Sequence, residues 1–431
     1  MQNMKYASVD RREILEWLFA QEASGIKFGL ENTRDLLERM GCPHKKFKSI
    51  HITGTNGKGS VSAMAESVLR EAGYVTGLYT SPHLVDFGER IRVCGEKISN
   101  EDFLELAAEV KHHADEMFRE SKRLTFFELT TVIAFSHFAR KGVEIAVVEV
   151  GMGGRLDSTN VITPEVCAIT PISMEHAEFL GDTISKIAAE KAGIIKPGIP
   201  VVSSRQTKDA MEVIKSKADT ITVAGEDSAF EIISSDASGT KIFSEALGMD
   251  LSVPLIGRYQ GDNCALAALL IQVLMNKGIY IPDAAIIRGL QNTKWPGRLE
   301  TVSFSPRIII DCTHTPAGAK AVASEVKRIF GEVILVFGIL KDKDVKSVAE
   351  EFGQISKEVF TVEPNTGRAL PAELTSESFE SYTKVQICSS LREAISLAKE
   401  KAGLDGVVLI TGSLYMAGEA MEVLNVSESV L

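Results

Sequence analysis

Short apolar runs alternate with stretches of helical periodicity through the first half of the chain. The expected strands are Ser49–Thr53, Gly77–Tyr79, Glu144–Val150, Val166–Ile172 and Pro200–Ser203. Between them, the spacing of apolar residues predicts helices near 61–73, 100–120, 126–141, 183–193 and 208–218. Because this alternation is typical of βαβ units, we expect a doubly wound α/β domain with a parallel sheet.

Three further segments complete this first domain. Residues 8–40 predict two amphipathic helices around a break at Ser24-Gly25. Residues 220–255 carry short β-like pieces joined by Gly, Asp and Ser, which predicts a small antiparallel annex. A helical pattern follows at 261–277.

The alternation restarts after Trp295-Pro296-Gly297. The expected strands are Ile308–Asp311, Val333–Phe337, Glu358–Val362, Lys384–Ile387 and Val407–Thr411. The helices between them are expected near 317–330, 343–354, 390–402 and 415–424. We therefore expect one domain over residues 1–295 and a smaller, Rossmann-like α/β domain over residues 296–431.

Composition narrows the functional classes. A chain of 431 residues is long enough for two or three domains. A net charge of −11 argues against a nucleic-acid partner, which needs a basic face. No run approaches the roughly 18 apolar residues of a membrane span. The six cysteines form no C-x-x-C pair and are expected to be reduced, so we expect a cytoplasmic protein.

The segment that follows the first expected strand is a candidate phosphate-binding loop. It consists of Gly54, Thr55, Asn56, Gly57, Lys58, Gly59 and Ser60. Glycines let backbone N–H groups approach phosphates, and the helix that follows adds its dipole. Lys58 can supply a positive charge, and Ser60 can hold Mg²⁺. The spacing departs from the usual pattern because Gly59 separates Lys58 from Ser60.

Glu149 closes the apolar run Ile145–Val150, at a strand end where open α/β sheets bind ligands. A charge in such a run is costly without a cationic partner, so we expect Glu149 to hold Mg²⁺; the alternative is a surface residue before a turn. The glycine-rich residues 151–160 match a dinucleotide fingerprint only in part, and a substrate-contacting loop fits them better.

Other polar residues at expected strand ends leave both readings open. His176 is either a metal or proton-handling residue or a structural one. Ser81 and His83 can contact a metal and a substrate, or belong to a proline turn. Lys191 ends a helix pattern in which spacing pairs Lys186 with Glu190, and spacing alone does not mark it.

The second domain repeats this arrangement. Asp311 ends an expected strand and can bind a ribose or a cation, and His314 follows it. Arg298 lies at the expected domain junction, and Ser413 lies in the segment Thr411–Tyr415 after the last strand. Each residue is a weak signal alone.

Taken together, these motifs resemble the folylpolyglutamate synthases and dihydrofolate synthases of the Mur ligase superfamily over nearly the whole chain. The first half carries the resemblance through Phe28–Glu31, Gly54–Ser60, Ser81–Leu84, Glu89–Arg92, Thr125–Glu128 and Glu149–Asp157. It continues through Glu190–Gly193, Tyr259-Gln260, Asn263, Pro296–Glu300, Asp311–Pro316, Lys341–Asp344 and Thr411–Tyr415.

The resemblance implies an ATP-dependent amide ligase. It assigns ATP to Gly54–Ser60, with Asn263, Arg298 and Asp311 completing the nucleotide contacts. It implies two Mg²⁺ sites, held by Ser60, Ser81, Glu149, His176 and a Lys191 that carries a carbamate. Lys58, His176 and Lys191 are the implied catalytic residues. The implied substrate-binding residues are Ser81, His83, Thr125, Phe126, Phe127, Glu128, Leu156, Asp157, Ser158, His314 and Ser413.

The implied reaction transfers the γ-phosphate to a substrate carboxylate, and the amine of L-glutamate then attacks the acyl phosphate. The implied partners are ATP, L-glutamate and dihydropteroate or a reduced folate, and the implied state is a monomer. Glu175, Thr315, Ser158 and Gly88 stand where the family usually has other residues. The alternatives are a Mur-type ligase for another carboxylate, such as a different pterin, and a nucleotide-dependent regulatory module.

Overall fold

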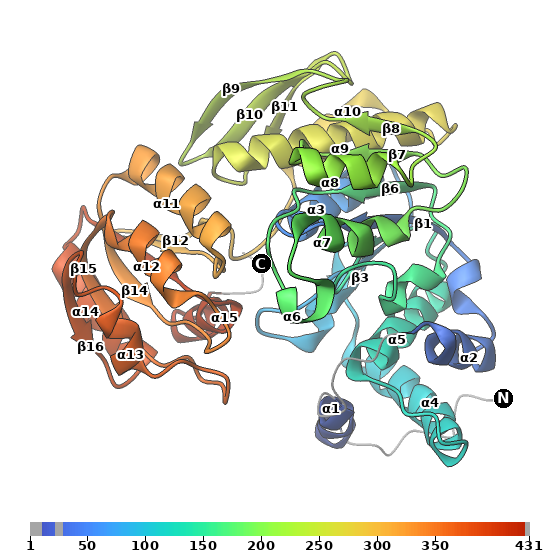
Figure 1. Cartoon of the computed structure of the whole chain (residues 1–431), viewed down its shortest axis with the longest axis horizontal. Coiled ribbons are helices and arrows are strands. Elements are labelled where there is room, and N and C mark those ends of the chain that lie inside the picture. Colours follow the sequence, from blue (N-terminus) through green and yellow to red (C-terminus); the bar gives the residue numbers. More distant parts are fainter. Residues whose placement is uncertain (1–10, 22–28, 427–431) are drawn as a thin grey trace. The chain divides into compact units, whose positions relative to one another are not determined.

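The computed structural model describes residues 11–21 and 29–426 (Figure 1). The expected break at Ser24-Gly25 and the motif residue Phe28 lie outside the described residues. The chain divides into two compact units. The first unit comprises Met1–Phe230, Ser244–Met249 and Asn263–Asn292. The second unit comprises Glu231–Phe243, Asp250–Asp262 and Thr293–Leu431. The predicted boundary at residues 295 and 296 stays a prediction.

Eight strands form the sheet of the first unit, in the order β4-β3-β2-β5-β1-β6-β7-β8. Their bounds are β1 Lys48–Thr53, β2 Thr76–Tyr79, β3 Ile91–Val93, β4 Glu96–Lys97, β5 Ile145–Glu149, β6 Val166–Ile169, β7 Val201–Ser203 and β8 Ile221–Val223. The six strands from β2 to β8 in this order pair in parallel, as expected. The sequence pattern missed β3 and β4, which are short, partly exposed and paired antiparallel at one edge.

Helices cover both faces of this sheet. Their bounds are α1 Arg11–Ala20, α2 Glu31–Arg39, α3 Lys58–Glu71, α4 Asn100–Arg119, α5 Phe126–Arg140, α6 Ala177–Leu180, α7 Ile184–Lys191, α8 Lys208–Lys215, α9 Arg258–Asn276 and α10 Asp283–Gln291. Strands β5 and β6 are buried along their whole length, which is why they appear as continuous apolar runs.

Two apolar clusters lie on one face of the sheet. The first packs α1, α2, α4 and α5 on β2 and β5 through side chains such as Phe135 and Val148. The second packs α7 and α8 on β6 and β7 through side chains such as Cys167 and Ile187. Between these clusters, the register aligns His51 of β1 with Val148 of β5 and Cys167 of β6. A histidine therefore interrupts an otherwise apolar row.

The start of α5 is set by its own residues. Thr125 is the N-cap, and its hydroxyl accepts a hydrogen bond from the Glu128 backbone N–H at 3.3 Å. The Glu128 carboxylate in turn accepts the Thr125 backbone N–H at 2.8 Å. This capping box satisfies backbone donors at the helix N-terminus.

Residues 230–253 form a small sheet within the predicted annex of residues 220–255, but Ile221–Val223, which the prediction included in the annex, pairs with β7 in the large sheet. Its order is β11-β10-β9, with bounds β9 Phe230–Asp236, β10 Gly239–Ser244 and β11 Met249–Val253.

The second large sheet has the order β12-β13-β17-β14-β15-β16. Its bounds are β12 Glu300–Phe304, β13 Arg307–Ile310, β14 Val333–Phe337, β15 Ser356–Thr361, β16 Lys384–Ile387 and β17 Val407–Thr411. All strands except β12 pair in parallel. Its helices are α11 Pro316–Phe330, α12 Val345–Gly353, α13 Ala372–Glu377, α14 Leu391–Ala402 and α15 Leu414–Val423. Phe337, Phe352 and Phe379 lie at the centre of its core.

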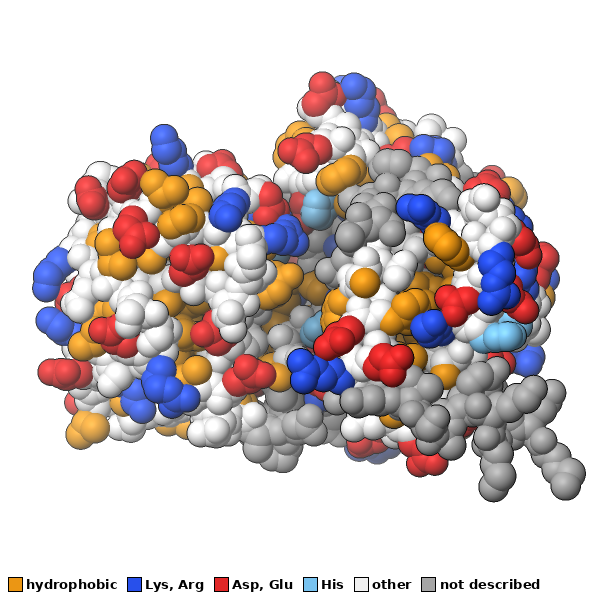
Figure 2. Space-filling view, turned by 90° about the horizontal axis from the view of Figure 1, so that it is seen from below, with side chains coloured by type: hydrophobic (Ala, Val, Ile, Leu, Met, Phe, Trp, Pro, Cys, Tyr) orange, Lys and Arg blue, Asp and Glu red, His pale blue; other side chains and the backbone are white. Residues whose placement is uncertain are grey.

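The described surface carries charged side chains of both signs. On the face in Figure 2, acidic and basic side chains are interspersed among the described residues. None of the helices within residues 11–21 and 29–426 has the length and apolar character of a membrane span.

A buried histidine on α5 predicts acid sensitivity. Burial, and then Lys141 and Arg140, lower the pKa of His137 to about 4, against the opposing effect of Asp102. Because the unfolded chain binds this proton at a higher pH than the folded chain, stability falls as pH drops from 6.5 to 4, by up to about 3 kcal/mol.

We expect His137→Leu to reduce the loss of unfolding free energy between pH 6.5 and pH 4, measured by urea unfolding at several pH values. His112→Leu, at an exposed histidine, is the control and is expected to keep the wild-type slope. Equal slopes in wild type and His137→Leu would contradict the assignment.

Candidate functional site

The candidate site lies at the carboxyl edge of four adjacent strands, β2, β5, β1 and β6. Because these strands are parallel, the segments that leave their ends meet at one edge. Ser81 follows β2, Glu149 ends β5, the glycine loop follows β1, and His176 lies beyond β6. The structure therefore places four separate sequence motifs along one edge.

The glycine loop leads directly into α3. The helix begins at Lys58, three residues before the expected start at Val61, because Gly59 and Ser60 form part of its first turn. Gly57 is the N-cap with φ +90°, a conformation that favours glycine. A Cβ atom at Gly57 would lie 2.4 Å from Asn263 Oδ1, so the Asn263 amide lies against the loop. The backbone N–H groups of the first helical turn have no intrahelical partner and suit an anion.

Two lysines converge on one carbonyl oxygen in this loop. Lys58 Nζ donates to the oxygens of Gly54 and Thr55, both at 3.2 Å. Lys191 Nζ donates to Gly54 O at 2.6 Å. Burial and the Lys58 charge lower the pKa of Lys191 to about 7, against the opposing effect of Glu175 and Asp157. Lys191 therefore titrates near neutral pH, and the pair attracts anions.

The predicted pairing of Lys186 with Glu190 on α7 is wrong. Lys186 Nζ lies 2.8 Å from Asp182, whereas Glu190 pairs with Arg155 at 2.9 Å. Arg155 N also donates to Glu190 O at 2.8 Å. Contacts with the glycine-rich loop after β5 outcompete pairing along the helix, and single-helix spacing could not reveal them.

Glu149 and Ser81 meet at the ends of their strands. Glu149 is 4% exposed, and its Oε2 atom accepts the Ser81 backbone N–H at 3.4 Å. This contact brings two predicted metal ligands together. Burial of the carboxylate agrees with a buried site and not with the alternative of a surface residue.

The segment before His176 is attached to the glycine loop. Thr55 Oγ1 donates to Ser173 O and accepts from Ser173 N, both at 3.1 Å. His176 itself is exposed, with φ +51°, and its Nε2 atom lies 3.7 Å from Glu175 Oε1.

The predicted substrate residues of α5 border an aromatic group. The Phe127 ring lies 6.0 Å from the Tyr79 ring, and Phe126 packs edge-on against Phe87 at 6.3 Å. Thr125 and Glu128 are used in the capping box. Their role in substrate binding stays a prediction.

Arg90 lies in the motif Glu89–Arg92, but sequence reasoning assigned it no role in the site. It is buried, it lies 5.1 Å from the Phe126 ring centroid, and its Nε donates to His83 Nδ1 at 2.7 Å. Burial and the Arg90 charge lower the pKa of His83 to about 4, against the opposing effect of Glu89 and Asp86. A guanidinium between aromatic rings could not be identified from the surrounding polar sequence.

The loop after β5 places Leu156, Asp157 and Ser158 before a short 3-10 helix, Ser158–Val161. Leu156 is half-buried, and Asp157 and Ser158 are buried. Asp157 caps the short helix by accepting Thr159 N at 3.0 Å.

The second unit contains four predicted site residues. Asp311 is buried, and its carboxylate accepts Leu299 N at 3.0 Å and Thr313 N at 2.8 Å. Arg298 Nη1 donates to Gly297 O at 2.9 Å. His314 Nδ1 contacts Cys312 O at 2.9 Å, and Ser413 caps α15 by accepting Met416 N at 3.1 Å. The Asp311 carboxylate thus organises the turn that carries Arg298.

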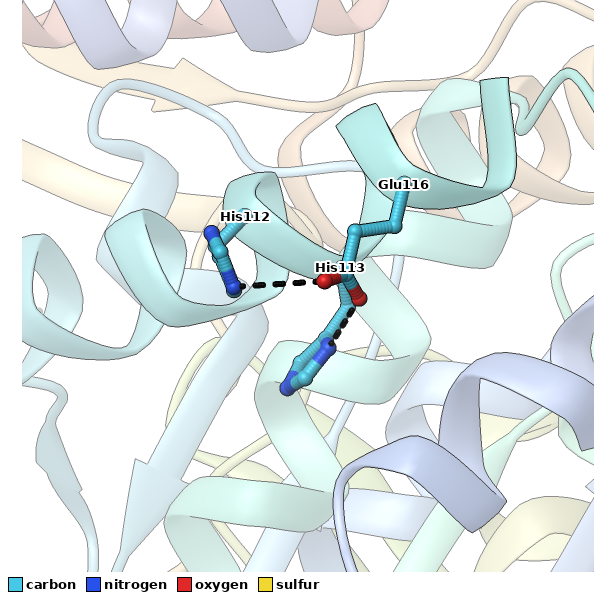
Figure 3. A group of neighbouring side chains, drawn as sticks. All are labelled: His112, His113 and Glu116. Carbon is cyan, nitrogen blue, oxygen red and sulfur yellow. Dashed lines mark hydrogen bonds and ion pairs between the residues drawn. The ribbon is translucent and has the colours of Figure 1, made fainter. Parts of the chain in front are cut away.

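One further group of potential ligands lies on α4. Among the described residues, His112, His113 and Glu116 bring their potential ligand atoms within 4.8 Å of one another (Figure 3). Glu116 Oε2 lies 3.1 Å from His113 Nδ1 and 3.7 Å from Arg39 Nη1. Because a fixed cation already contacts this carboxylate, we assign no metal to the group.

Comparisons with known proteins agree with this arrangement. Family models match residues 52–271 as the Mur ligase middle domain and residues 297–414 as the Mur ligase, glutamate ligase domain. A dihydrofolate synthase/folylpolyglutamate synthase of Bacillus subtilis is 35% identical over 94% of this chain and 96% of that protein.

A probable bifunctional folylpolyglutamate synthase/dihydropteroate synthase of Haloferax volcanii is 33% identical over 96% of this chain. The chain spans 50% of the length of that relative. Among solved structures, Mycobacterium tuberculosis folylpolyglutamate synthase complexed with ADP and AMPPCP matches with a TM-score of 0.87 and 32% identity. The match covers 96% of this chain and 99% of that one.

The conformation of Gly57 predicts a specific binding defect. Gly57→Ala introduces strain at φ +90° and a clash with Asn263. Gly73→Ala has similar strain at φ +93°, but its Cβ meets nothing within 4 Å. Both variants are expected to lose about 1–2 kcal/mol of stability in urea unfolding.

Only Gly57→Ala is expected to weaken ATP binding, by about tenfold or more, in isothermal titration calorimetry. Unchanged ATP affinity in Gly57→Ala, or an equal loss of ATP affinity in the two variants, would rule out this loop as the phosphate site.

Proposed function

The chain belongs to the folylpolyglutamate synthase and dihydrofolate synthase family within the Mur ligases, and on that premise we propose that it joins L-glutamate to the carboxylate of dihydropteroate, of a reduced folate, or of both. The protein is an ATP-dependent carbon–nitrogen ligase. We further propose a cytoplasmic location, in keeping with six free cysteines, and a monomeric state, which the family resemblance implies.

The convergence of Lys58 and Lys191 on the Gly54 carbonyl is the observation that carries this proposal. Two basic side chains meet at a helix N-terminus, beside the buried Glu149 carboxylate. Phosphoryl transfer requires this concentration of positive charge more than it requires a nucleophilic side chain. The β- and γ-phosphates of ATP bind at residues 54–60, with Lys58 on their oxygens.

The residues present suit Mg²⁺. Mg²⁺ prefers oxygen ligands, and the set contains the Glu149 carboxylate and the hydroxyls of Ser60 and Ser81, together with His176. When bound, Mg²⁺ neutralises charge on the phosphates. The burial of Glu149 favours a cation near its carboxylate.

Lys191 completes this ligand set as a carbamate. A neutral amine can add CO₂ through its lone pair, and burial beside Lys58 makes the neutral form of Lys191 accessible. The carbamate exchanges a positive for a negative charge and presents two oxygens, which are ligands that Mg²⁺ accepts. Lys191 thereby joins Ser60, Ser81, Glu149 and His176 as a proposed Mg²⁺ ligand.

The acceptor binds beside the aromatic residues of α5. Its aromatic ring system contacts Phe126 and Phe127, with Thr125, Glu128 and the loop residues Leu156–Ser158 around it. We assign Ser81 and His83 to the part of the acceptor that carries the carboxylate. Stacking on phenylalanine rings suits a flat heterocycle.

The reaction follows from this placement. A carboxylate oxygen of the acceptor attacks the γ-phosphorus, ADP leaves, and an acyl phosphate forms. The amine of L-glutamate attacks the acyl carbon, the amide C–N bond forms, and phosphate leaves with loss of one proton from nitrogen. In the first unit, Asn263 lies against the phosphate loop and is proposed to contact the nucleotide. In the second unit, the family resemblance assigns Arg298 and Asp311 to nucleotide binding and His314 and Ser413 to substrate binding.

ADP release tests the proposed function. Purified protein receives ATP, Mg²⁺ and L-glutamate with 7,8-dihydropteroate, with tetrahydrofolate, or with no acceptor. Acceptor-dependent ADP release together with a new glutamyl product is expected, and the acceptor used defines the reaction. Absence of turnover with both pterins, from folded protein that binds ATP, would overturn the assignment and point to another carboxylate.

Substitution of Lys191 tests its role. Lys191→Met is expected to lower kcat by about 100-fold or more, because a group that acts at the phosphates is lost. Lys186→Met, on the same helix but paired with the exposed Asp182, is expected to keep kcat within about twofold. A ¹³C carbamate signal from wild type in ¹³C-bicarbonate, absent in Lys191→Met, identifies the modification. Wild-type kcat in Lys191→Met would exclude the catalytic role.

A further inference from the structure

A buried histidine is linked through a threonine to the loop Leu156–Ser158, which we assign to the acceptor substrate. His51 Nε2 lies 2.8 Å from Thr159 Oγ1, and Thr159 Oγ1 is hydrogen-bonded to Asp157 Oδ1 at 2.5 Å. Both His51 and Thr159 are 0% exposed. Asp157 belongs to the loop that we assign to the acceptor, whereas His51 lies under it on β1. None of the sequence motifs includes His51.

The Asp157 carboxylate is otherwise bound by backbone groups. Its Oδ1 atom accepts Thr159 N at 3.0 Å, and its Oδ2 atom accepts Met152 N at 2.9 Å. These bonds fix the orientation of the carboxyl group. Burial raises the pKa of the Asp157 carboxyl group, and these hydrogen bonds oppose that effect, because an ionised carboxylate only accepts hydrogen bonds.

The single hydroxyl proton of Thr159 allows two arrangements of this chain. In the first, His51 Nε2–H donates to Thr159, and Thr159 donates to an ionised Asp157. In the second, a protonated Asp157 donates to Thr159, and Thr159 donates to His51 Nε2, so the proton of His51 is on Nδ1.

The surroundings of His51 Nδ1 decide between them. This atom is buried, and no hydrogen-bond partner is found for it. The second arrangement buries an N–H donor without an acceptor, whereas the first leaves only an unused lone pair, which costs less. Burial and the nearby Lys196 lower the pKa of His51 well below its usual value, so the ring is neutral. The first arrangement is therefore preferred.

We propose that His51 and Thr159 are positioning residues that hold the Asp157 carboxylate as a hydrogen-bond acceptor for N–H groups of the acceptor substrate. This inference rests on the proposed function for the identity of that substrate. An aminopyrimidinone ring, which presents adjacent N–H donors, fits a fixed carboxylate.

Matched substitutions separate this role from packing. Thr159→Val removes the hydroxyl and keeps the shape, whereas Thr159→Ser keeps the hydroxyl. Thr159→Val is expected to raise KM for the pterin acceptor by about tenfold, because the carboxylate loses a donor. KM for ATP and kcat are expected to stay within about twofold of wild type, and Thr159→Ser is expected to resemble wild type.

The same comparison applies to His51. The amide N–H₂ of His51→Gln can replace the Nε2–H donor, and His51→Leu cannot. His51→Gln is expected to keep KM for the pterin, and His51→Leu to raise it as Thr159→Val does. If Thr159→Val and Thr159→Ser have the same KM for the pterin, or if ATP and pterin are affected alike, the proposal is wrong.

A measurement without substrate keeps the two hypotheses separate. The ¹⁵N resonances of His51, assigned with His51→Gln, are expected to show a protonated Nε2 and an unprotonated Nδ1 in the free protein. A proton on Nδ1 would show that Asp157 is not an ionised hydrogen-bond acceptor, even if the enzyme uses pterins. A protonated Nε2 in a protein that shows no turnover with any pterin would support an ionised Asp157 carboxylate and contradict the proposed function.

Discussion

The structure depends on the hydrogen bonds that two lysines donate to the Gly54 carbonyl oxygen. This oxygen lies where the central strand β1 ends and α3 begins, so Lys58 reaches it from the first turn of that helix. Lys191 reaches it from the end of α7, more than 130 residues further along the chain. Like charges at one oxygen repel unless an anion or a neutral amine compensates them. A phosphate and a carbamate are two ways to provide that compensation, and the other site residues are arranged around this point.

Much of the fold could be predicted from periodicity. Strands such as β1, β5, β6 and β14 are almost entirely buried, and their limits differ from the expected ones by at most three residues. The short edge strands β3 and β4 were missed because they hold few residues and are partly exposed. The start of α3 was placed late because glycine and serine are poor helix formers, although they suit a phosphate-binding turn.

The candidate site could be predicted only in part. Strand-end position identified Glu149, and its burial agrees with that reading. Lys191 could be proposed only from the family resemblance, because its importance arises from contact with Gly54, which is remote in sequence. Arg90 and His51 were missed for the same reason. Their partners His83 and Thr159 become neighbours through pairing of strands and packing of loops.

The close approach of the loop after β5 to the end of α7 has a mechanical consequence. A Cβ atom at Gly154 would lie 2.7 Å from Lys191 O, and a Cβ atom at Gly193 would lie 2.5 Å from Arg155 Cα. Backbone therefore lies directly against backbone, with no side chain between them to absorb a displacement. The loop that carries Asp157 and the segment that carries Lys191 must shift together. Under the proposed function, an acceptor that draws this loop inward will also move Lys191, so acceptor binding and phosphate geometry share one rigid element.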